Sequence, residues 1–356
     1  MQDTNYTTKL FDAHTASEKE FDAVNTFINI LRAEELPDDP PRSLEYTVNN
    51  LKSLDKFENH ELKDWYTWQG ERVIAMVFTN IGFHENNRHL INIELGVHPD
   101  FRRQGIATTL LRHIVEAADE HGRTLIIHGH LDHLRSGKAF IECLGGKAGL
   151  AGHENQLSFA DLDRNLIRSW IEDASSTAAD FSLGLWDGPF PEEEIDAVIA
   201  LLQVMNTAPT GELELEDEVM TAQDLRDWED YMRACGSERW TLYARHTPTG
   251  ELAGYTETVW NPDDPETLEQ GDTAVLPKYR GHGLGKWLKA AMIEKVLAER
   301  PQVKRIRTGN ADSNAPMLAI NHKLGFKPYH PWTDWQIEIE QIRAYLERKN
   351  EFDTLL

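Results

Sequence analysis

One glycine-containing motif occurs twice in this sequence, in matching surroundings. The first copy, LGVHPDFRRQGIATTLL, starts at Leu95, and the second, TAVLPKYRGHGLGKWLK, starts at Thr273. Gly105 of the first copy matches Gly283 of the second, and 283 − 105 = 178, which is half of the 356 residues in the chain. A repeat of this length predicts two copies of one folding unit, each of ordinary domain size.

The predicted elements repeat in the same order around the motif. Each half has apolar residues at helical spacing, then a shorter helix, paired strands, the motif strand, a long helix and a buried strand. This order predicts an α+β unit whose mixed, mostly antiparallel sheet is flanked by helices, with domains at 1–174 and 175–356. The expected elements are Phe21–Arg32, Ser43–Leu54, Trp65–Gln69, Val73–Phe83, Leu90–Val97, Ile106–His121, Thr124–His128 and Gln156–Phe159, then Ile195–Gln203, Ala222–Met232, Trp240–His246, Leu252–Trp260, Thr273–Leu276, Leu284–Glu299, Lys304–Thr308 and Trp335–Ile339.

Charge and composition exclude several classes of protein. The formal net charge of −24 repels phosphate backbones, so we expect no nucleic-acid partner and favour a cationic small molecule. No apolar run approaches the ~20 residues of a membrane helix, and the N-terminus lacks a signal pattern. Two cysteines, Cys143 and Cys235, are too few for a disulfide framework. These features predict a cytoplasmic protein without a membrane partner.

The repeated motif has the chemistry of an anion site. In Arg-x-x-Gly-x-Gly/Ala, the glycines let the backbone turn tightly at a strand-to-helix junction and approach a ligand closely. The unpaired amides of the first helical turn point outward, and the positive end of the helix dipole lies behind them. Such a loop suits a pyrophosphate. A glycine-rich helix start without a ligand is the alternative for one copy, but two copies in register disfavour it.

At these residues the sequence resembles the GNAT superfamily of acyl-CoA-dependent N-acyltransferases. The matching segments are Arg102–Ala107 and Arg280–Gly285, and in the second half also 310–317 and 321–326, with an Asn…Asn…Leu-Gly-Phe pattern. The two-copy layout is similar to that of bacterial tandem acetyltransferases. The resemblance covers nearly the whole chain and implies two tandem GNAT folds, one in each half.

The resemblance also implies the donor and the residues that hold it. Acetyl-CoA would place its pyrophosphate on the loops and its pantetheine arm along the motif strands, where a backbone amide polarises the thioester carbonyl. The acetyl group would then pass directly to an amine. The residues implied to bind acetyl-CoA are Val275, Leu276, Arg280, Gly281, His282, Gly283, Leu284, Gly285, Lys286, Asn310, Asn314, Met317 and Asn321 in the second half, and Val97, Arg102, Arg103, Gln104, Gly105, Ile106 and Ala107 in the first.

The two halves differ downstream of the motif. Leu144 matches Leu324, but the first half has no asparagine at the position of Asn314, and Gly146 replaces the aromatic Phe326. We therefore expect the first half to be a degenerate, accessory domain that can bind acyl-CoA. The second half is expected to be catalytic. A purely structural duplicate remains the alternative for the first half.

Two carboxylates are candidates for the base that accepts the amine proton. Glu257 lies on a strand that borders the site in this fold, and Asp272 lies three residues before Val275, as Glu94 does before Val97. Partial burial would raise the pKa of such a carboxylate and suit it to this role. The alternative for each is an ordinary solvated strand residue.

The general acid departs from the family pattern. Where the family often has a tyrosine, this chain has Asn321, which cannot donate a titrating proton. Tyr329 is the candidate substitute, with packing as its alternative role. Because a thiolate is a stable leaving group near neutral pH, water can also supply the proton. His128, His130 and His133 lack a nearby acidic triad, so we expect no metal site.

An acidic segment, 206–218, carries five carboxylates and follows the first helix of the second half. In this fold it would cap the acceptor pocket, and its acids would recognise a cationic acceptor; an ordinary solvated loop is the alternative. The acidic residues are Glu212, Glu214, Glu216, Asp217 and Glu218.

The leading functional reading is transfer of acetyl from acetyl-CoA to the primary amine of a small molecule, by a monomer or homodimer. Three alternatives stay open: a non-catalytic acyl-CoA sensor or scaffold, a protein N-acetyltransferase, and aminoacyl transfer from charged RNA. The last conflicts with the net charge.

Overall fold

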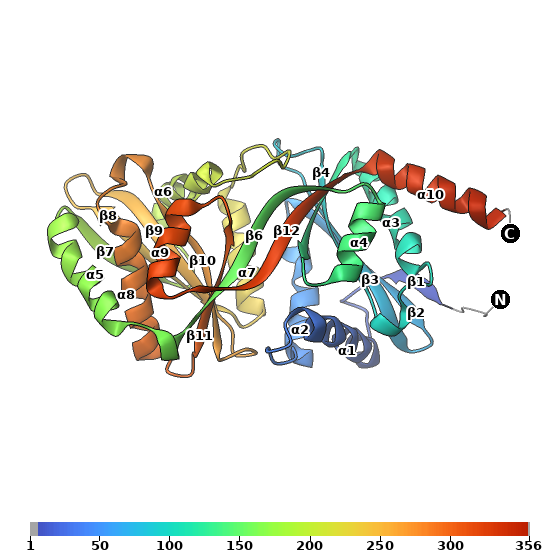
Figure 1. Cartoon of the computed structure of the whole chain (residues 1–356), viewed down its shortest axis with the longest axis horizontal. Coiled ribbons are helices and arrows are strands. Elements are labelled where there is room, and N and C mark those ends of the chain that lie inside the picture. The colour runs from blue at the N-terminus through green and yellow to red at the C-terminus, as the bar shows by residue number, and fades with distance from the viewer. Residues whose placement is uncertain (1–5, 355–356) are drawn as a thin grey trace. The chain divides into compact units, whose positions relative to one another are not determined.

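The computed structural model describes residues 6–354, which form two compact units (Figure 1). Unit 1 contains the described residues up to Ala151, the segment Thr210–Asp217, and the described residues from Trp332 onward. Unit 2 contains Gly152–Pro209 and Glu218–Pro331. Each unit is an α+β fold with a mixed, mostly antiparallel sheet flanked by helices, as the sequence predicts.

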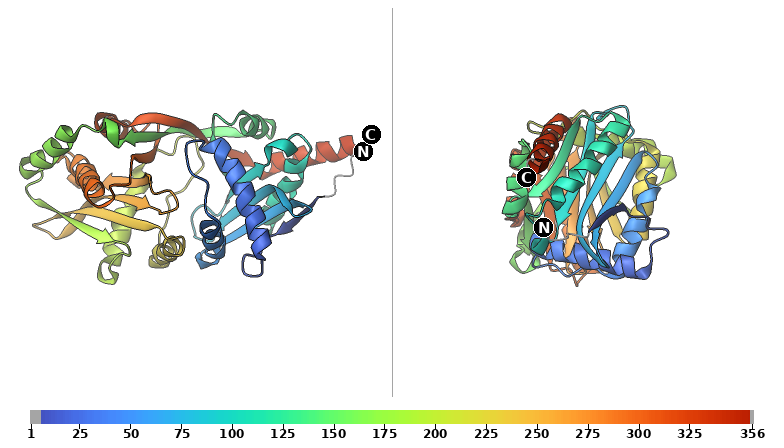
Figure 2. Two further views of the ribbon diagram at one scale, coloured as in Figure 1. Left: turned by 90° about the horizontal axis from the view of Figure 1, so that it is seen from below. Right: turned by 90° about the vertical axis from the view of Figure 1, so that its right-hand side faces the viewer.

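Unit 1 is built on the strand order β1-β2-β3-β4-β5-β12, in which only β4 and β5 run parallel. Helix α1 packs with Tyr66 and Trp68 on one face, and α3 and α10 cover the other face, as Figure 2 shows. Its elements are β1 (Thr7–Leu10), α1 (Glu18–Glu35), α2 (Leu44–Lys52), β2 (His60–Gln69), β3 (Arg72–Gly82), β4 (Leu90–Val97), α3 (Ile106–His121), β5 (Leu125–Leu131), α4 (Arg135–Cys143) and α10 (Ile339–Thr354).

Unit 2 repeats this architecture with the order β7-β8-β9-β10-β11-β6, and β10 and β11 form its parallel pair. Helices α5 and α8 pack on one face, and α6 and α7 on the other. Its elements are α5 (Arg164–Thr177), β7 (Phe181–Asp187), α6 (Ile195–Leu202), α7 (Ala222–Ala234), β8 (Glu238–His246), β9 (Glu251–Trp260), β10 (Thr267–Val275), α8 (Leu284–Glu299), β11 (Arg305–Ala311) and α9 (Ala315–Leu324).

Two long strands belong to both units. Strand β6 (Lys147–Ser158) begins in unit 1, but its residues from Gly152 onward pair with β11 of unit 2. Strand β12 (Lys327–Glu338) begins in unit 2, and Trp332–Glu338 pair with β5 of unit 1. The closing strand of each sheet therefore comes from the other half of the sequence.

Because β6 and β12 are exchanged, the two units do not match the domains expected at 1–174 and 175–356. The first boundary lies at 151/152, and the expected boundary falls inside α5, which belongs wholly to unit 2. The C-terminal helix α10 belongs to unit 1, where Ile339 and Ile342 are buried in the core. The reason is that a periodic apolar pattern shows a strand but not the sheet with which it pairs.

The parallel strands in each unit pair only at one end. In unit 1 the β4–β5 ladder covers Leu90–Asn92, and in unit 2 the β10–β11 ladder covers Thr267–Glu269. Beyond these residues neither strand pairs with its neighbour in these ladders, so the sheet opens at the edge that leads to the glycine loops. In the described residues, no helix is long and apolar enough to span a bilayer.

Candidate active site

The two glycine loops have almost the same backbone geometry. Gly105 and Gly283 are the N-cap residues of α3 and α8, with φ of 81° and 78°. These left-handed values favour glycine, and a glycine has no side chain with which to cap the first-turn amides. A Cβ at Gly105 or Gly281 would meet no atom within 4 Å, so the backbone here is open to a ligand. The loops thus fit the diphosphate of acyl-CoA, which the sequence predicted for them.

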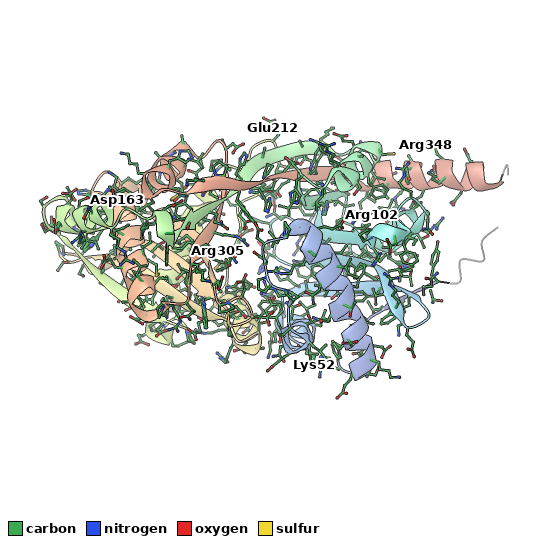
Figure 3. All side chains as sticks on the ribbon, turned by 60° about the horizontal axis from the view of Figure 1, so that its bottom comes forward. Lys52, Arg102, Asp163, Glu212, Arg305 and Arg348 are labelled. Carbon is green, nitrogen blue, oxygen red and sulfur yellow. The ribbon has the colours of Figure 1, made fainter. Side chains whose placement is uncertain are left out.

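The motif arginines bond to the strands that precede their loops. Arg102 Nε donates to the carbonyl of Val97 at 3.0 Å, and its guanidinium pairs with Glu34 of α1 (Figure 3). Arg280 likewise donates to the carbonyl of Val275 at 3.1 Å. Both side chains therefore tie the loop to its strand, and Arg280 Nη2 also donates to the hydroxyl of Thr207 at 3.2 Å.

Other residues near the second loop also have partners within unit 2. Lys286 Nζ lies 5.7 Å from the centre of the Trp170 ring, and the His282 ring lies 5.5 Å from Phe181. The amide of Leu276 donates to the carbonyl of Ala253 at 2.8 Å. Leu276 therefore cannot offer this amide to a thioester carbonyl without losing a sheet hydrogen bond.

The expected asparagines lie together behind the opened sheet. Asn321 is completely buried, and its Nδ2 donates to Oδ1 of Asn310 at 2.7 Å. Asn155, from the exchanged strand β6, donates to the same oxygen at 3.3 Å. Asn314 instead caps helix α9 by accepting from the amide of Met317. Three asparagines thus form a buried polar cluster at the place where the family often has a tyrosine.

Both predicted base candidates line one cavity of about 140 Å³ in unit 2. Glu257 comes from β9 and Asp272 from β10, and the hydroxyl of Tyr255 donates to Asp272 at 3.4 Å. The third acidic residue on the cavity is Glu218. Apolar side chains form much of the remaining wall, among them Leu202, Met205, Met220, Leu225 and Trp228.

A bulge in β10 makes room for Glu257. The β9–β10 register shifts between Gln270 and Thr273, and Gln270 Nε2 holds this irregularity by donating to the carbonyl of Glu257 at 2.5 Å. A Cβ at Gly271 would lie 2.9 Å from Oε1 of Glu257. Glycine at this position therefore leaves the carboxylate its space.

The electrostatics of the cavity favour a neutral or easily protonated carboxyl group. Burial, together with the neighbouring Asp272 carboxylate, raises the pKa of Glu257 to about 7, although Arg239 acts in the opposite direction. Burial also raises the pKa of Asp272, against the hydrogen bond from Tyr255. A carboxylate whose pKa lies near neutrality can accept a proton during turnover and release it afterwards.

Unit 1 has no counterpart of the Glu257 arrangement. Val97 pairs with Ala75 and Val275 pairs with Gly254, so by strand register Glu257 corresponds to Phe78, and the β3–β4 register has no bulge residue equivalent to Gly271. Unit 1 does contain a cavity of about 640 Å³, which follows the loop from Gly105 to Ala107 and continues to Val97. The position of this cavity along the glycine loop is consistent with the expected acyl-CoA site in unit 1. The unit 1 cavity has no carboxylate at the position of Glu257.

Carboxylates are also present in the unit 1 cavity. Glu35 and Glu94 line it, and burial, with Glu94 nearby, raises the pKa of Glu35 to about 6. Glu94 is the counterpart of Asp272, as the sequence indicated.

Tyr329 lies apart from the two candidate bases. It lies on β12, where its ring is 4.6 Å from the guanidinium carbon of Arg307 and 3.8 Å from the ring of His330. The residues that line the unit 2 cavity do not include it. The structure therefore gives Tyr329 packing contacts and does not bring it together with Glu257.

Most of the acidic segment lies on unit 1, contrary to its expected position over the acceptor pocket. The amide of Glu214 donates to Gln336 at 3.0 Å and that of Glu216 to Asn87 at 2.8 Å. Glu212, labelled in Figure 3, bonds through its amide to Gly149. Of the five acids, only Glu218 lines the unit 2 cavity. The irregular segment 210–217 satisfies its backbone groups on unit 1, which the charge pattern could not show.

The histidines considered as metal ligands bond to backbone oxygen atoms. His128 Nδ1 lies 2.9 Å from the carbonyl of Ile93, and His130 Nε2 lies 2.9 Å from that of Leu134. His133 Nε2 lies 3.2 Å from the carbonyl of Glu34.

Sequence reasoning missed several residues of the unit 2 cavity. Tyr255 lies two residues before Glu257 on the same strand, so strand alternation could have placed it on the same face. Gly271 and Arg239 gave no comparable signal, because a bulge and a long-range ion pair leave no periodic pattern. Trp228 occupies helix α7, where spacing alone predicts a helix but not a cavity wall.

Comparison with known proteins agrees with this geometry. The model of the acetyltransferase (GNAT) family matches residues 25–145 and 205–326. No curated protein matches the chain. A solved tandem GNAT protein from the clavulanic acid biosynthesis pathway is 27% identical, with a TM-score of 0.77, and the match covers 94% of this chain and 99% of that one.

A second solved structure shows the fold alone. A GCN5-related N-acetyltransferase from Sphaerobacter thermophilus is 14% identical, with a TM-score of 0.64 and coverage of 94% of this chain and 96% of that one. The family model covers most of both halves, each with its glycine loop. The chain therefore belongs to the GNAT family, as a tandem acyl-CoA-dependent N-acyltransferase.

Proposed function

We propose that unit 2 transfers an acetyl group from acetyl-CoA to the primary amine of a small molecule, with Glu257 as the base. The observation that carries this proposal is the convergence of Glu257 and Asp272 on one cavity, beside the opened end of β10. The cavity volume of about 140 Å³ suits a small acceptor. The glycine loop at Gly283 would hold the diphosphate of the donor.

The reaction needs a group that accepts a proton from the amine, and a neighbouring group that keeps the pKa of this acceptor high. Glu257 removes a proton from the bound ammonium, and the free amine attacks the thioester carbonyl. The new C–N bond forms, the C–S bond breaks, and the second proton that the nitrogen loses passes through water to the departing thiolate of CoA. Asp272, held by Tyr255, keeps the pKa of Glu257 high enough for this step. Tyr329 is not needed as an acid because the thiolate is a stable leaving group.

Unit 1 has a different part in this proposal. Its cavity of about 640 Å³ supports acyl-CoA binding, while Phe78 stands at the position of the base and no bulge residue matches Gly271. We propose that unit 1 is accessory, and that it binds acyl-CoA without rapid acetyl transfer.

Release of CoA from acetyl-CoA, measured against a panel of small amines, tests this function. The Glu257→Gln variant removes the base at little cost in volume, so turnover should fall by roughly a hundredfold or more. Glu266→Gln is the matched control, because Glu266 is an exposed residue of the same unit that pairs with Lys304. Full activity of Glu257→Gln would overturn the assignment of the base. Acetyl-CoA binding without turnover of any amine would favour a sensor.

A further inference from the structure

A buried arginine, Arg239, lines the unit 2 cavity. The Arg239 side chain is 4% exposed, and Nη2 donates to Glu229 and to the carbonyl of Gly188, each at 2.9 Å. Its guanidinium lies 4.0 Å from the centre of the Phe190 ring. The Nε atom is buried and has no hydrogen-bond partner within the part of the chain that the structure describes. A buried N–H without an acceptor is costly, and this one belongs to a residue that lines the cavity.

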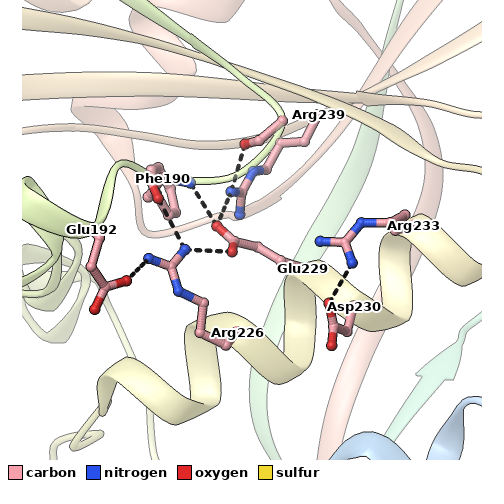
Figure 4. Close-up of polar contacts among 8 residues, drawn as sticks. Phe190, Glu192, Arg226, Glu229, Asp230, Arg233 and Arg239 are labelled. Carbon is pink, nitrogen blue, oxygen red and sulfur yellow. Dashed lines mark hydrogen bonds and ion pairs between the residues drawn. The ribbon is translucent and has the colours of Figure 1, made fainter.

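The guanidinium groups of Arg239 and Arg226 share one buried carboxylate. Glu229 also accepts from Arg226 Nη1 at 2.7 Å, so one buried carboxylate serves two guanidinium groups (Figure 4). The other acidic partner of Arg226 is Glu192, which is 82% exposed and therefore contributes little. An anionic group in the cavity would complete the set of charges around Arg239.

The carboxylate of Glu257 lies near Arg239 on the same face of the sheet. Arg239 pairs with Val259 and Thr241 pairs with Glu257, so Arg239 and Glu257 are diagonal neighbours across β8 and β9. Diagonal neighbours lie about 7–8 Å apart on one face of a sheet. Arg239 also acts on the pKa of Glu257, which agrees with this proximity. The cavity therefore presents a cation and a carboxylate at a separation that one small molecule can span.

We propose that the acceptor is an amino acid, or a small zwitterion of the same kind, whose carboxylate binds Arg239 while its amine faces Glu257. This inference rests on the proposed function and adds the chemical class of the acceptor. Arg239 lines the cavity, and a guanidinium matches a carboxylate in geometry and charge. Trp228, which is 43% exposed, and Met220 provide apolar surface for the side chain of the amino acid.

Matched pairs of acceptors test the inference. Each pair shares a skeleton and differs only in the carboxylate: phenylalanine with phenethylamine, leucine with isoamylamine, and ornithine with putrescine. With acetyl-CoA as donor, kcat/KM should be higher for the amino acid by roughly thirtyfold in at least one pair, since removing one partner of a buried charge pair costs about 2 kcal/mol or more. A preference for the amine in every pair would overturn the proposal.

The Arg239→Met variant assigns the preference to this residue. The ratio of kcat/KM within each pair should fall toward one, mainly through a higher KM for the amino acid. Arg239→Lys keeps the charge without the planar fork and should recover part of the ratio. Arg233→Met is the matched control, because Arg233 lies on α7, is 66% exposed and pairs with Asp230 (Figure 4). An unchanged ratio in folded Arg239→Met, verified by circular dichroism, would overturn the proposal.

Direct binding separates this inference from the proposed function. N-acetylphenylalanine and N-acetylphenethylamine are titrated calorimetrically into the wild type in the presence of CoA. If no acceptor is turned over but only the acid binds, the recognition of the carboxylate stands while the proposed transfer reaction fails. If the amide without a carboxylate binds equally well, the role of Arg239 is refuted even where turnover is observed.

Discussion

Arg103 shows how one residue distinguishes the two glycine loops. It has a φ of 65°, a left-handed value that is costly for a residue with a Cβ, and at the offset of 178 its counterpart is Gly281, with a φ of 89°. Arg103→Gly should therefore raise the free energy of unfolding by about 0.5–1 kcal/mol, the strain relieved minus the greater entropy of glycine in the unfolded chain. Urea denaturation measures this change.

The converse substitution is the control for this prediction. A Cβ at Gly281 meets no atom within 4 Å, so Gly281→Ala changes only the backbone preference and should destabilise the protein. If Arg103→Gly destabilises instead, the left-handed conformation of Arg103 does not limit stability.

The acidity of Glu257 predicts the pH dependence of acetyl transfer. Because the base must be ionised, kcat/KM should rise with pH through about 7, the pKa to which burial and Asp272 raise Glu257. Asp272→Asn removes the neighbouring negative charge, so the rise should move to lower pH. An unchanged midpoint in kcat/KM against pH would show that another group titrates.

At the residue scale, sequence alone identified part of the unit 2 cavity. Glu257 and Asp272 could be chosen because the motif fixes the strands on which they lie. Arg239 could not be chosen from the sequence, because its place beside the cavity depends on its ion pair with Glu229 and on the pairing of β8 with β9. The motif arginines were expected to bind acetyl-CoA, and the motif alone could not show that Nε of each one also donates to a strand carbonyl.

At the scale of elements, helix α8 carries a lysine where its apolar face would predict a hydrophobic residue. Lys289 is 2% exposed, and its Nζ lies 5.6 Å from the centre of the Phe326 ring. Burial lowers the pKa of Lys289 to about 7 from an ordinary value of 10.5. The folded state thus binds this proton more weakly than the unfolded state, and stability is lost as pH falls from 10.5 toward 7.

Replacement of this lysine should stabilise unit 2. At pH 7 the Lys289→Met variant should gain free energy of unfolding, with an upper limit of about 5 kcal/mol from about 1.4 kcal/mol per pKa unit. The gain should shrink as the pH rises toward 10.5, the ordinary pKa of lysine. Thermal denaturation as a function of pH measures it, with Lys323→Met on the exposed side of α9 as control. A loss of stability at pH 7 would mean that Lys289 has a stabilising partner in solution.

Most helices and strands follow from local pattern, but their assignment to a sheet does not. The helices 106–121 and 284–299 were predicted with the bounds that the structure has. Strand β10 was expected only from Thr273, because the bulge at Gly271 interrupts the alternation that identifies a strand. Strands β1 and β7 and helix α10 were not predicted.

At the scale of the whole molecule, duplication and exchange together define the chain. The offset of 178 predicted two units of one fold, which the structure and the family match confirm. The exchange of β6 and β12 was outside the reach of the sequence, since each strand has the same pattern whichever sheet it completes. An acidic stretch expected at the acceptor pocket likewise lies mostly on unit 1.

Our central proposal is that unit 2 carries out acetyl transfer and that unit 1 does not. Gly283→Glu and Gly105→Glu form a matched pair, because both glycines are N-cap residues with φ near 80° (78° and 81°), so the backbone strain is the same. Each glutamate places bulk and negative charge where the diphosphate of acetyl-CoA would lie. The decisive measurement is the rate of CoA release for the two variants and the wild type, with an accepted amine. We expect Gly283→Glu to abolish turnover and Gly105→Glu to retain it; loss of turnover with Gly105→Glu and retention with Gly283→Glu would contradict the assignment of the chemistry to unit 2.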